Sequence, residues 1–144
     1  MGAKAMDIFI IEDTNFQSLK ELFDDLTDRV ANGWSRGQET TFVFVYYTGH
    51  GVQANYTYAV LNNPDPRRWR FPLEMYLRTL GTNPGAWVVG VFDCCRENFT
   101  LPGRGNGDEE IVDMSGYRNT FMTFGCPPNK EVSARSTLAV EYFK

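Results

Sequence analysis

The chain has 144 residues, of which 42% are hydrophobic and 15% aromatic, which is enough to build one globular domain with its own core. Its formal net charge of -4 argues against non-specific nucleic-acid binding, because neutralising phosphates requires a surplus of Lys and Arg. No apolar run approaches the length of a membrane span, and the opening residues MGAKAMDIFI lack the apolar segment of a signal peptide. We therefore expect a cytoplasmic protein that binds neither nucleic acid nor membranes.

The first third of the sequence predicts a strand followed by a helix. The apolar stretch DIFII (7–11) predicts the strand. Apolar residues at helical spacing predict the helix, over about 15–32. Thr14 and Gln17 have the spacing of a capping box at its start, and Gly33 is a typical stop.

The rest of the chain continues the alternation of strands and helices. Residues 41–47 are apolar on both faces, which is typical of a central strand in a helix-covered parallel sheet. Further strands are predicted at 56–61, 86–92 and 119–125, and further helices at 72–80 and 136–144. This alternation predicts an α/β fold with a mostly parallel central sheet flanked by helices.

Cysteine and histidine are both scarce. The three cysteines include the adjacent pair Cys94 and Cys95, and an odd number with no export signal indicates a reducing compartment. The only histidine is His50, so the chain has no Cys/His set with the spacing of a zinc site, and we predict no metal ligands.

Two of the predicted strands lead directly to reactive side chains. The strand 41–47 leads to His50 and the strand 86–92 to Cys95, and in open α/β sheets chemistry collects at the carboxyl ends of the strands. An imidazole can take the proton of a thiol, whose thiolate is the nucleophile, and can later protonate the leaving group. Each residue alone is more often structural. Together, at the ends of two apolar strands, they predict a His–Cys dyad.

The motifs around this pair carry a resemblance to a known family. YYTGHGV (46–52) and VFDCCRE (91–97) resemble the caspase-like cysteine peptidases, which comprise caspases, metacaspases and paracaspases. The resemblance implies a three-layer caspase-like fold, with His50 as general base and Cys95 as nucleophile. It also implies an oxyanion hole formed by the backbone N–H groups of Gly51 and Cys95, and it leaves Cys94 as a packing residue.

The residue before the cysteine pair favours the metacaspase and paracaspase branches of the family. Asp93 matches their acidic residue, which lines the pocket for an Arg or Lys side chain of the substrate. A carboxylate in a confined pocket recognises a guanidinium strongly. We predict Asp93 and Thr48 as substrate-binding residues. From the residues alone, Asp93 fits a turn after a strand equally well.

The family's fold has elements for which this sequence offers no match. It begins with a strand and a helix before DIFII and ends with a further strand, and we expect the chain to lack all three. We interpret 1–144 as a single domain, with a part that resembles the large subunit (7–97) and a partial small-subunit-like part (119–144). No cofactor is required by the motifs. Calcium activation stays open, although the acidic run of calcium-dependent metacaspases does not follow His50.

The connecting loop 98–118 is glycine-rich and charged. In the family that this chain resembles, activating cleavage occurs in the corresponding connection. Arg104 lies there between two glycines and is the candidate for self-cleavage.

These observations predict a cysteine endopeptidase that cleaves proteins or peptides after Arg or Lys. The alternative is a catalytically inactive caspase-like module that acts as a binding or assembly scaffold. A redox protein that uses the vicinal cysteines ranks last, because adjacent cysteines form a strained ring and no Cys-x-x-Cys is present. A homo-oligomer, a hetero-oligomer or a complementing chain is compatible with each interpretation.

Overall fold

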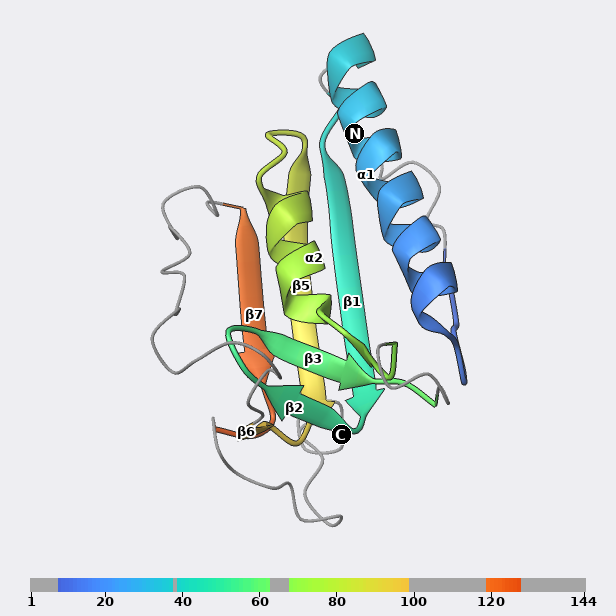
Figure 1. Cartoon of the computed structure of the whole chain (residues 1–144). Helices are drawn as coiled ribbons and strands as arrows, with labels where there is room; N and C mark the ends of the chain where they lie inside the picture. The colour runs from blue at the N-terminus through green and yellow to red at the C-terminus, as the bar shows by residue number, and fades with distance from the viewer. Residues whose placement is uncertain (1–7, 38, 63–67, 99–118, 128–144) are drawn as a thin grey trace.

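The computed structural model of the chain describes residues 8–37, 39–62, 68–98 and 119–127. They form a parallel sheet with two helices on one face and a smaller sheet at one end (Figure 1). The elements in chain order are α1 (Phe16–Gly37), β1 (Thr41–Gly49), β2 (Gly51–Gln53), β3 (Thr57–Val60), β4 (Arg70–Phe71), α2 (Leu73–Gly81), β5 (Ala86–Cys94), β6 (Glu97–Asn98) and β7 (Thr120–Phe124). The predicted α/β class is confirmed.

The main sheet has the strand order β1-β5-β7, and both of its pairings are parallel. The smaller sheet has the order β4-β3-β2-β6, in which β2 and β3 form an antiparallel hairpin. Figure 1 places β2 and β3 across the carboxyl ends of β1 and β5, with β6 beside β2. The edge of the sheet where α/β proteins carry their chemistry is therefore built from two sheets.

The core lies between the main sheet and the two helices. Phe71 is fully buried, and its ring stacks on Tyr76 at a centroid distance of 4.6 Å and on Phe23 at 5.7 Å. Leu77 of α2 is equally buried, and Phe92 of β5 is 1% exposed. These contacts fix the helix-covered face of β5, the strand that carries the cysteine pair.

Most predicted elements are confirmed to within two residues at each end. They are the strands 41–47, 56–61, 86–92 and 119–125 and the helix 72–80, observed as β1, β3, β5, β7 and α2. The short strands β2, β4 and β6 were not predicted, because two or three residues show no periodicity. The helix predicted at 136–144 lies outside the described residues.

Helix α1 begins and ends differently from the prediction. Asn15, and not Thr14, caps it, since the Asn15 side-chain oxygen accepts a hydrogen bond from the Ser18 N–H at 3.0 Å. The helix also continues past Gly33 to Gly37. There Trp34 packs so closely against Gly85 that a Cβ on Gly85 would lie 2.8 Å from the Trp34 Cβ. Tertiary packing thus stabilises the helix beyond Gly33, although glycine is a residue at which many helices end.

The predicted strand at 7–11 is wrong for the part that the structure describes, 8–11. No strand of the described chain pairs with it. Its apolar side chains stand in solvent, with Ile10 84% exposed. A strand needs a neighbour for its backbone hydrogen bonds, and strand propensity alone does not supply one.

Within the described chain the main sheet is covered by helices on one face only, and β1, which we expect from the sequence to be a central strand, lies at the edge of the sheet. β1 pairs with β5 alone. On the open face, Phe42 is 66% and Phe121 64% exposed. Phe44, Tyr46 and Trp87 are also exposed there. Apolar residues on both faces of a strand do not tell a sheet edge from its centre.

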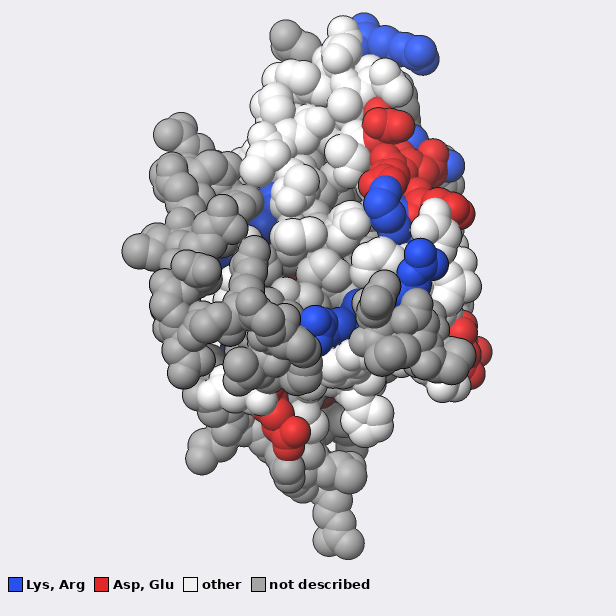
Figure 2. Space-filling view, viewed as in Figure 1, with Lys and Arg blue, Asp and Glu red and all other residues white. Residues whose placement is uncertain are grey.

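Charged side chains gather on the surface of α1. Figure 2 shows acidic and basic groups side by side along it, and ion pairs one helical turn apart join Lys20 to Asp24 and Asp25 to Arg29. This mixed face is typical of solvent exposure. None of the described helices combines the length and the apolar character needed to cross a bilayer.

Candidate active site

His50 and Cys95 lie at the same edge of the main sheet. β1 and β5 are neighbouring parallel strands, and their register pairs Gly49 with Cys94. His50 and Cys95 are the next residue along each strand. His50 is exposed and Cys95 is partly exposed. The structure thus brings the two predicted reactive residues to adjacent strand ends that solvent can reach.

The two glycines that flank His50 have different roles. Gly49 has a φ of 148°, a conformation that residues with a side chain rarely adopt. Gly51 lies against the cysteine pair, where a Cβ would be 2.5 Å from the Cys95 carbonyl oxygen and 2.6 Å from the Cys94 Sγ. Only glycine fits this contact. The backbones of Gly51 and Cys95, the predicted oxyanion-hole pair, therefore lie side by side.

The backbone at His50 is held by two hydrogen bonds to its carbonyl oxygen. The Val60 N–H donates one at 2.8 Å, and the Tyr47 hydroxyl donates the other at 2.7 Å. Burial raises the pKa of Tyr47 to about 12, so this hydroxyl keeps its proton at neutral pH. The main chain that presents the imidazole is tied both to its own strand and to β3.

Cys94 is part of the core. Its side chain is 2% exposed, and burial, with a smaller contribution from the neighbouring Cys95, raises its pKa to about 12. A buried, protonated thiol is a poor nucleophile. The prediction that Cys94 is a packing residue is confirmed. None of the three cysteines is in a disulfide.

Asp93 is buried, with 5% of its surface exposed. Its Oδ2 accepts a hydrogen bond from the Tyr46 hydroxyl at 3.0 Å, while its Oδ1 has no hydrogen-bond partner among the described residues. Thr48, opposite Asp93 in the strand register, is exposed. Burial and the bond to Asp93 raise the pKa of Tyr46. Sequence reasoning missed Tyr46, because its contact with Asp93 depends on the register of β1 and β5.

A buried ionic cluster attaches the small sheet to α2. The Glu74 carboxylate accepts a hydrogen bond from the backbone N–H of Thr57 at 2.8 Å, and it pairs with Arg78 at 2.7 Å. Glu74 is 6% exposed. The sequence analysis assigned it no role, although the Glu74–Arg78 spacing of four residues is a sequence signal. The cluster fixes the hairpin that follows His50.

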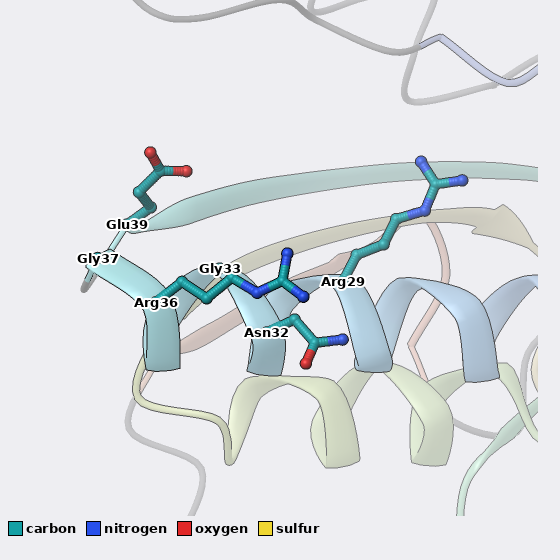
Figure 3. Close-up of a pocket in the computed structure, with 6 residues that line it drawn as sticks. All are labelled: Arg29, Asn32, Gly33, Arg36, Gly37 and Glu39. Atoms are coloured by element: carbon teal, nitrogen blue, oxygen red, sulfur yellow. The ribbon is translucent and has the colours of Figure 1, made fainter.

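The hollow drawn in Figure 3 lies away from this edge. Its lining comes from the last turns of α1 and from Glu39, just before β1, at the opposite end of that strand from His50. It contains none of the predicted site residues. Within the described chain no three His, Cys, Asp or Glu side chains cluster closely enough to hold a metal ion.

A parallel α/β sheet whose neighbouring strands end in a histidine and a cysteine defines the class of cysteine hydrolases as the first candidate. A family model described as the caspase domain matches residues 5–141. The match covers nearly the whole sequence, so the chain belongs to the caspase-domain family of cysteine peptidases. No curated protein matches the chain.

Proposed function

We propose that the protein is a cysteine endopeptidase in which His50 is the general base and Cys95 the nucleophile. The observation that carries this proposal is the register of β1 and β5, which pairs Gly49 with Cys94 and so sets His50 and Cys95 at neighbouring strand ends. The protein acts on protein or peptide substrates, in the cytoplasm.

The proposed reaction follows from these positions. The His50 imidazole takes the Cys95 thiol proton, and the thiolate attacks the scissile carbonyl carbon. The backbone N–H groups of Gly51 and Cys95 stabilise the resulting oxyanion. The C–N bond then breaks, and the departing amine takes the proton from His50. Water activated by His50 hydrolyses the thioester and restores the free thiol. This sequence of steps needs no cofactor.

We propose that Asp93 selects Arg or Lys on the amino side of the cleaved bond, as the metacaspase-like motif implies. What supports this is the Asp93 Oδ1, a buried carboxylate oxygen with no partner among the described residues. Such an oxygen is costly to leave unpaired, and a guanidinium or ammonium group would satisfy it. Because the side chain is 5% exposed, the substrate must displace neighbouring groups to reach it.

The test is labelling with a peptidyl-Arg electrophile followed by mass spectrometry. We expect a single adduct on Cys95, with none in Cys95→Ala and a rate at least about 100-fold slower in His50→Ala. Cys94→Ala is the matched control and should label normally. Peptide substrates with Arg, Lys or Asp at the cleaved position test specificity, and a preference for Asp would contradict the role of Asp93. Runs with and without calcium test calcium activation.

A second candidate is a catalytically inactive module that self-associates through the open face of the main sheet. The observation that favours it is the exposed apolar row of Phe42, Phe44, Trp87 and Phe121. These four side chains carry no charge, so two copies of the row meet without like-charge repulsion. Sedimentation of the wild type and of Phe44→Lys tests it. A monomeric wild type that cleaves peptides would exclude this candidate.

A further inference from the structure

Arg96, the residue after Cys95, contacts one segment that precedes it in the sequence, β2, and one that follows it, β7. Its Nε donates a hydrogen bond to the Gln53 side-chain oxygen of β2 at 3.0 Å. Its guanidinium lies over the Phe124 ring of β7, 3.9 Å from the centroid, and its Nη1 donates to the Cys126 carbonyl at 3.5 Å. One side chain thus joins the segment after β5 to both β2 and β7.

The setting of Arg96 favours strong contacts. The side chain is partly buried, and this burial lowers its pKa, while the charge of Glu74 acts in the opposite direction. A guanidinium keeps its charge under such a shift, and its attraction to a ring face increases as water is removed. The contact with Phe124 is therefore stronger than the same contact would be at a fully exposed site.

Both anchors of Arg96 are themselves held in place. The Gln53 oxygen also accepts a hydrogen bond from the Thr57 hydroxyl at 3.0 Å, and the Gln53 amide donates to the Ala54 carbonyl at 2.9 Å. The Phe124 ring stacks on Phe92, at a centroid distance of 5.0 Å. The Arg96 side chain is consequently held between the Gln53 amide and the Phe124 ring, each of which is fixed by its own contacts.

We propose that Arg96 is a positioning residue for Cys95. Gln53 lies two residues after Gly51 on β2, and Cys95 directly precedes Arg96. The clamp from Gln53 through Arg96 to Phe124 therefore fixes the backbone of Cys95 relative to Gly51, with which it forms the proposed oxyanion hole. This inference rests on the proposed peptidase function and adds to it a residue that does not touch the substrate.

Lysine cannot replace Arg96 in this arrangement. It carries the same charge, but it has no planar group. The guanidinium of arginine can stack on Phe124 and at the same time direct an N–H at Gln53, and an ammonium group cannot do both. Arg96→Lys and Phe124→Leu thus remove the clamp without removing a charge and without leaving a polar cavity. Arg70→Lys is the matched control, because Arg70 also lies over rings, Trp69 at 5.2 Å and Tyr58 at 5.7 Å, on the far strand of the small sheet.

The first measurement separates kcat from KM. We expect Arg96→Lys and Phe124→Leu each to lower kcat by about 10- to 100-fold, because a small displacement of reacting groups has that effect, and to leave KM within about twofold. The double variant should be no worse than the poorer single one, since both break the same clamp. Arg70→Lys should leave kcat unchanged.

The second measurement does not depend on activity. Amide hydrogen exchange of the peptide containing Cys95 and Arg96 should accelerate about tenfold in both variants. In Arg96→Lys, exchange in β5 and the thermal midpoint should stay at their wild-type values, whereas Phe124→Leu also removes the ring that stacks on Phe92 and should lower the midpoint. If the wild type cleaves no peptide, the proposed function fails, and exchange alone decides whether the clamp exists. Unchanged exchange and kcat in Arg96→Lys would overturn the inference. The inference would also be overturned if Arg96→Lys lowered kcat, raised KM and lowered the thermal midpoint together, because that pattern marks a residue with a purely structural role.

Discussion

Gly51 is the residue at which the proposed site has the least room. In Gly51→Ala the new Cβ would meet the Cys95 carbonyl oxygen at 2.5 Å, and a backbone atom cannot rotate away. We expect a loss of about 1–3 kcal/mol of unfolding free energy, as for other overpacked sites. We also expect at least about a 100-fold loss of peptidase activity, because the shift moves Cys95 itself. Urea unfolding and peptide cleavage measure the two effects.

Gly33→Ala is the control for this prediction. Gly33 lies inside α1 with no atom within 4 Å of its would-be Cβ, so alanine should stabilise the protein by about 0.5–1 kcal/mol and leave activity unchanged. A Gly51→Ala protein as active as the wild type would show that the contact between the His50 and Cys95 segments is not needed for function.

Two acidic groups near the site, the buried thiol of Cys94 and the partly buried hydroxyl of Tyr47, make the free energy of unfolding depend on pH in the alkaline range. Burial raises the pKa of Cys94 from 9.0 to about 12 and that of Tyr47 from 10.0 to about 12. Between pH 9 and 12 the unfolded chain loses these protons and the folded chain keeps them. The unfolded state then binds fewer protons, so stability falls as pH rises, by at most about 1.4 kcal/mol per pH unit for each group.

The measurement is the urea midpoint between pH 7 and pH 11. Well below pH 9 both groups are protonated in both states, so we expect neither to make the free energy of unfolding depend on pH. Cys94→Ala should reduce the slope above pH 9, whereas Cys95→Ala, which leaves the buried thiol in place, should reduce it less. A slope equal in Cys94→Ala and the wild type would contradict the burial of this thiol.

At this scale the sequence predicts the candidate dyad but not the contacts that hold the segments carrying it. His50 and Cys95 follow apolar strands and stand inside recognisable motifs, so both could be named in advance. The bond from Tyr46 to Asp93 joins residues 47 positions apart and depends on the strand register. The contacts of Arg96 depend on the position of β7 in the same way. No local pattern encodes either.

Among the elements, α1 shows how one side chain sets a helix start. The Asn15 side chain accepts the Ser18 N–H, so Asn15→Ala should lower the unfolding free energy by about 1 kcal/mol. Thr14→Ala is the matched control, since no hydrogen bond involves the Thr14 side chain within the described chain, and it should change stability by less than about 0.5 kcal/mol. Thermal unfolding distinguishes the two. A larger loss in Thr14→Ala would restore the predicted capping box.

The elements that local pattern predicts well are those whose packing agrees with it. β5 is apolar from Ala86 to Phe92 and lies between two strands, so its limits are close to the prediction. The segment 8–11 is equally apolar but has no neighbour in the described chain, and it forms no strand. Gly33 is a stop signal that the contact between Trp34 and Gly85 outweighs. In each case the packing partner determines whether the element forms and where it ends, and the sequence of a single segment does not identify that partner.

For the whole molecule, the proposed site depends on two sheets meeting at one edge. β1 and β5 supply His50 and Cys95, β2 supplies Gly51, and β7 supplies the ring under Arg96. His50 and Cys95 are 45 positions apart, and the chain between them contains the hairpin and α2, which cover one face of the sheet (Figure 1). The parts of the site are thus far apart in sequence and are assembled by parallel pairing.

This assembly predicts what a cut between β6 and β7 does. We expect cleavage after Arg104, a residue outside the described part of the chain, because the proposed site selects basic residues and Arg104 stands between two glycines in a polar, glycine-rich stretch. The two pieces should stay together. β7 pairs with β5 from Thr120 to Phe124, and Arg96 contacts both Phe124 and the Cys126 carbonyl from the other piece. A cut chain should therefore run as two bands on a denaturing gel and as one species in native chromatography.

The N-terminal sequence of the smaller piece checks the position, and we expect it to begin at Gly105. Cys95→Ala should remain uncut when incubated alone, and Arg104→Gln should block the cut in an otherwise active protein, which separates self-cleavage from a contaminating protease. Phe124→Leu tests the association, because a cut chain without the ring under Arg96 should separate at a lower urea concentration than the cut wild type. If active protein shows no cut after Arg104, activation does not proceed through this connection.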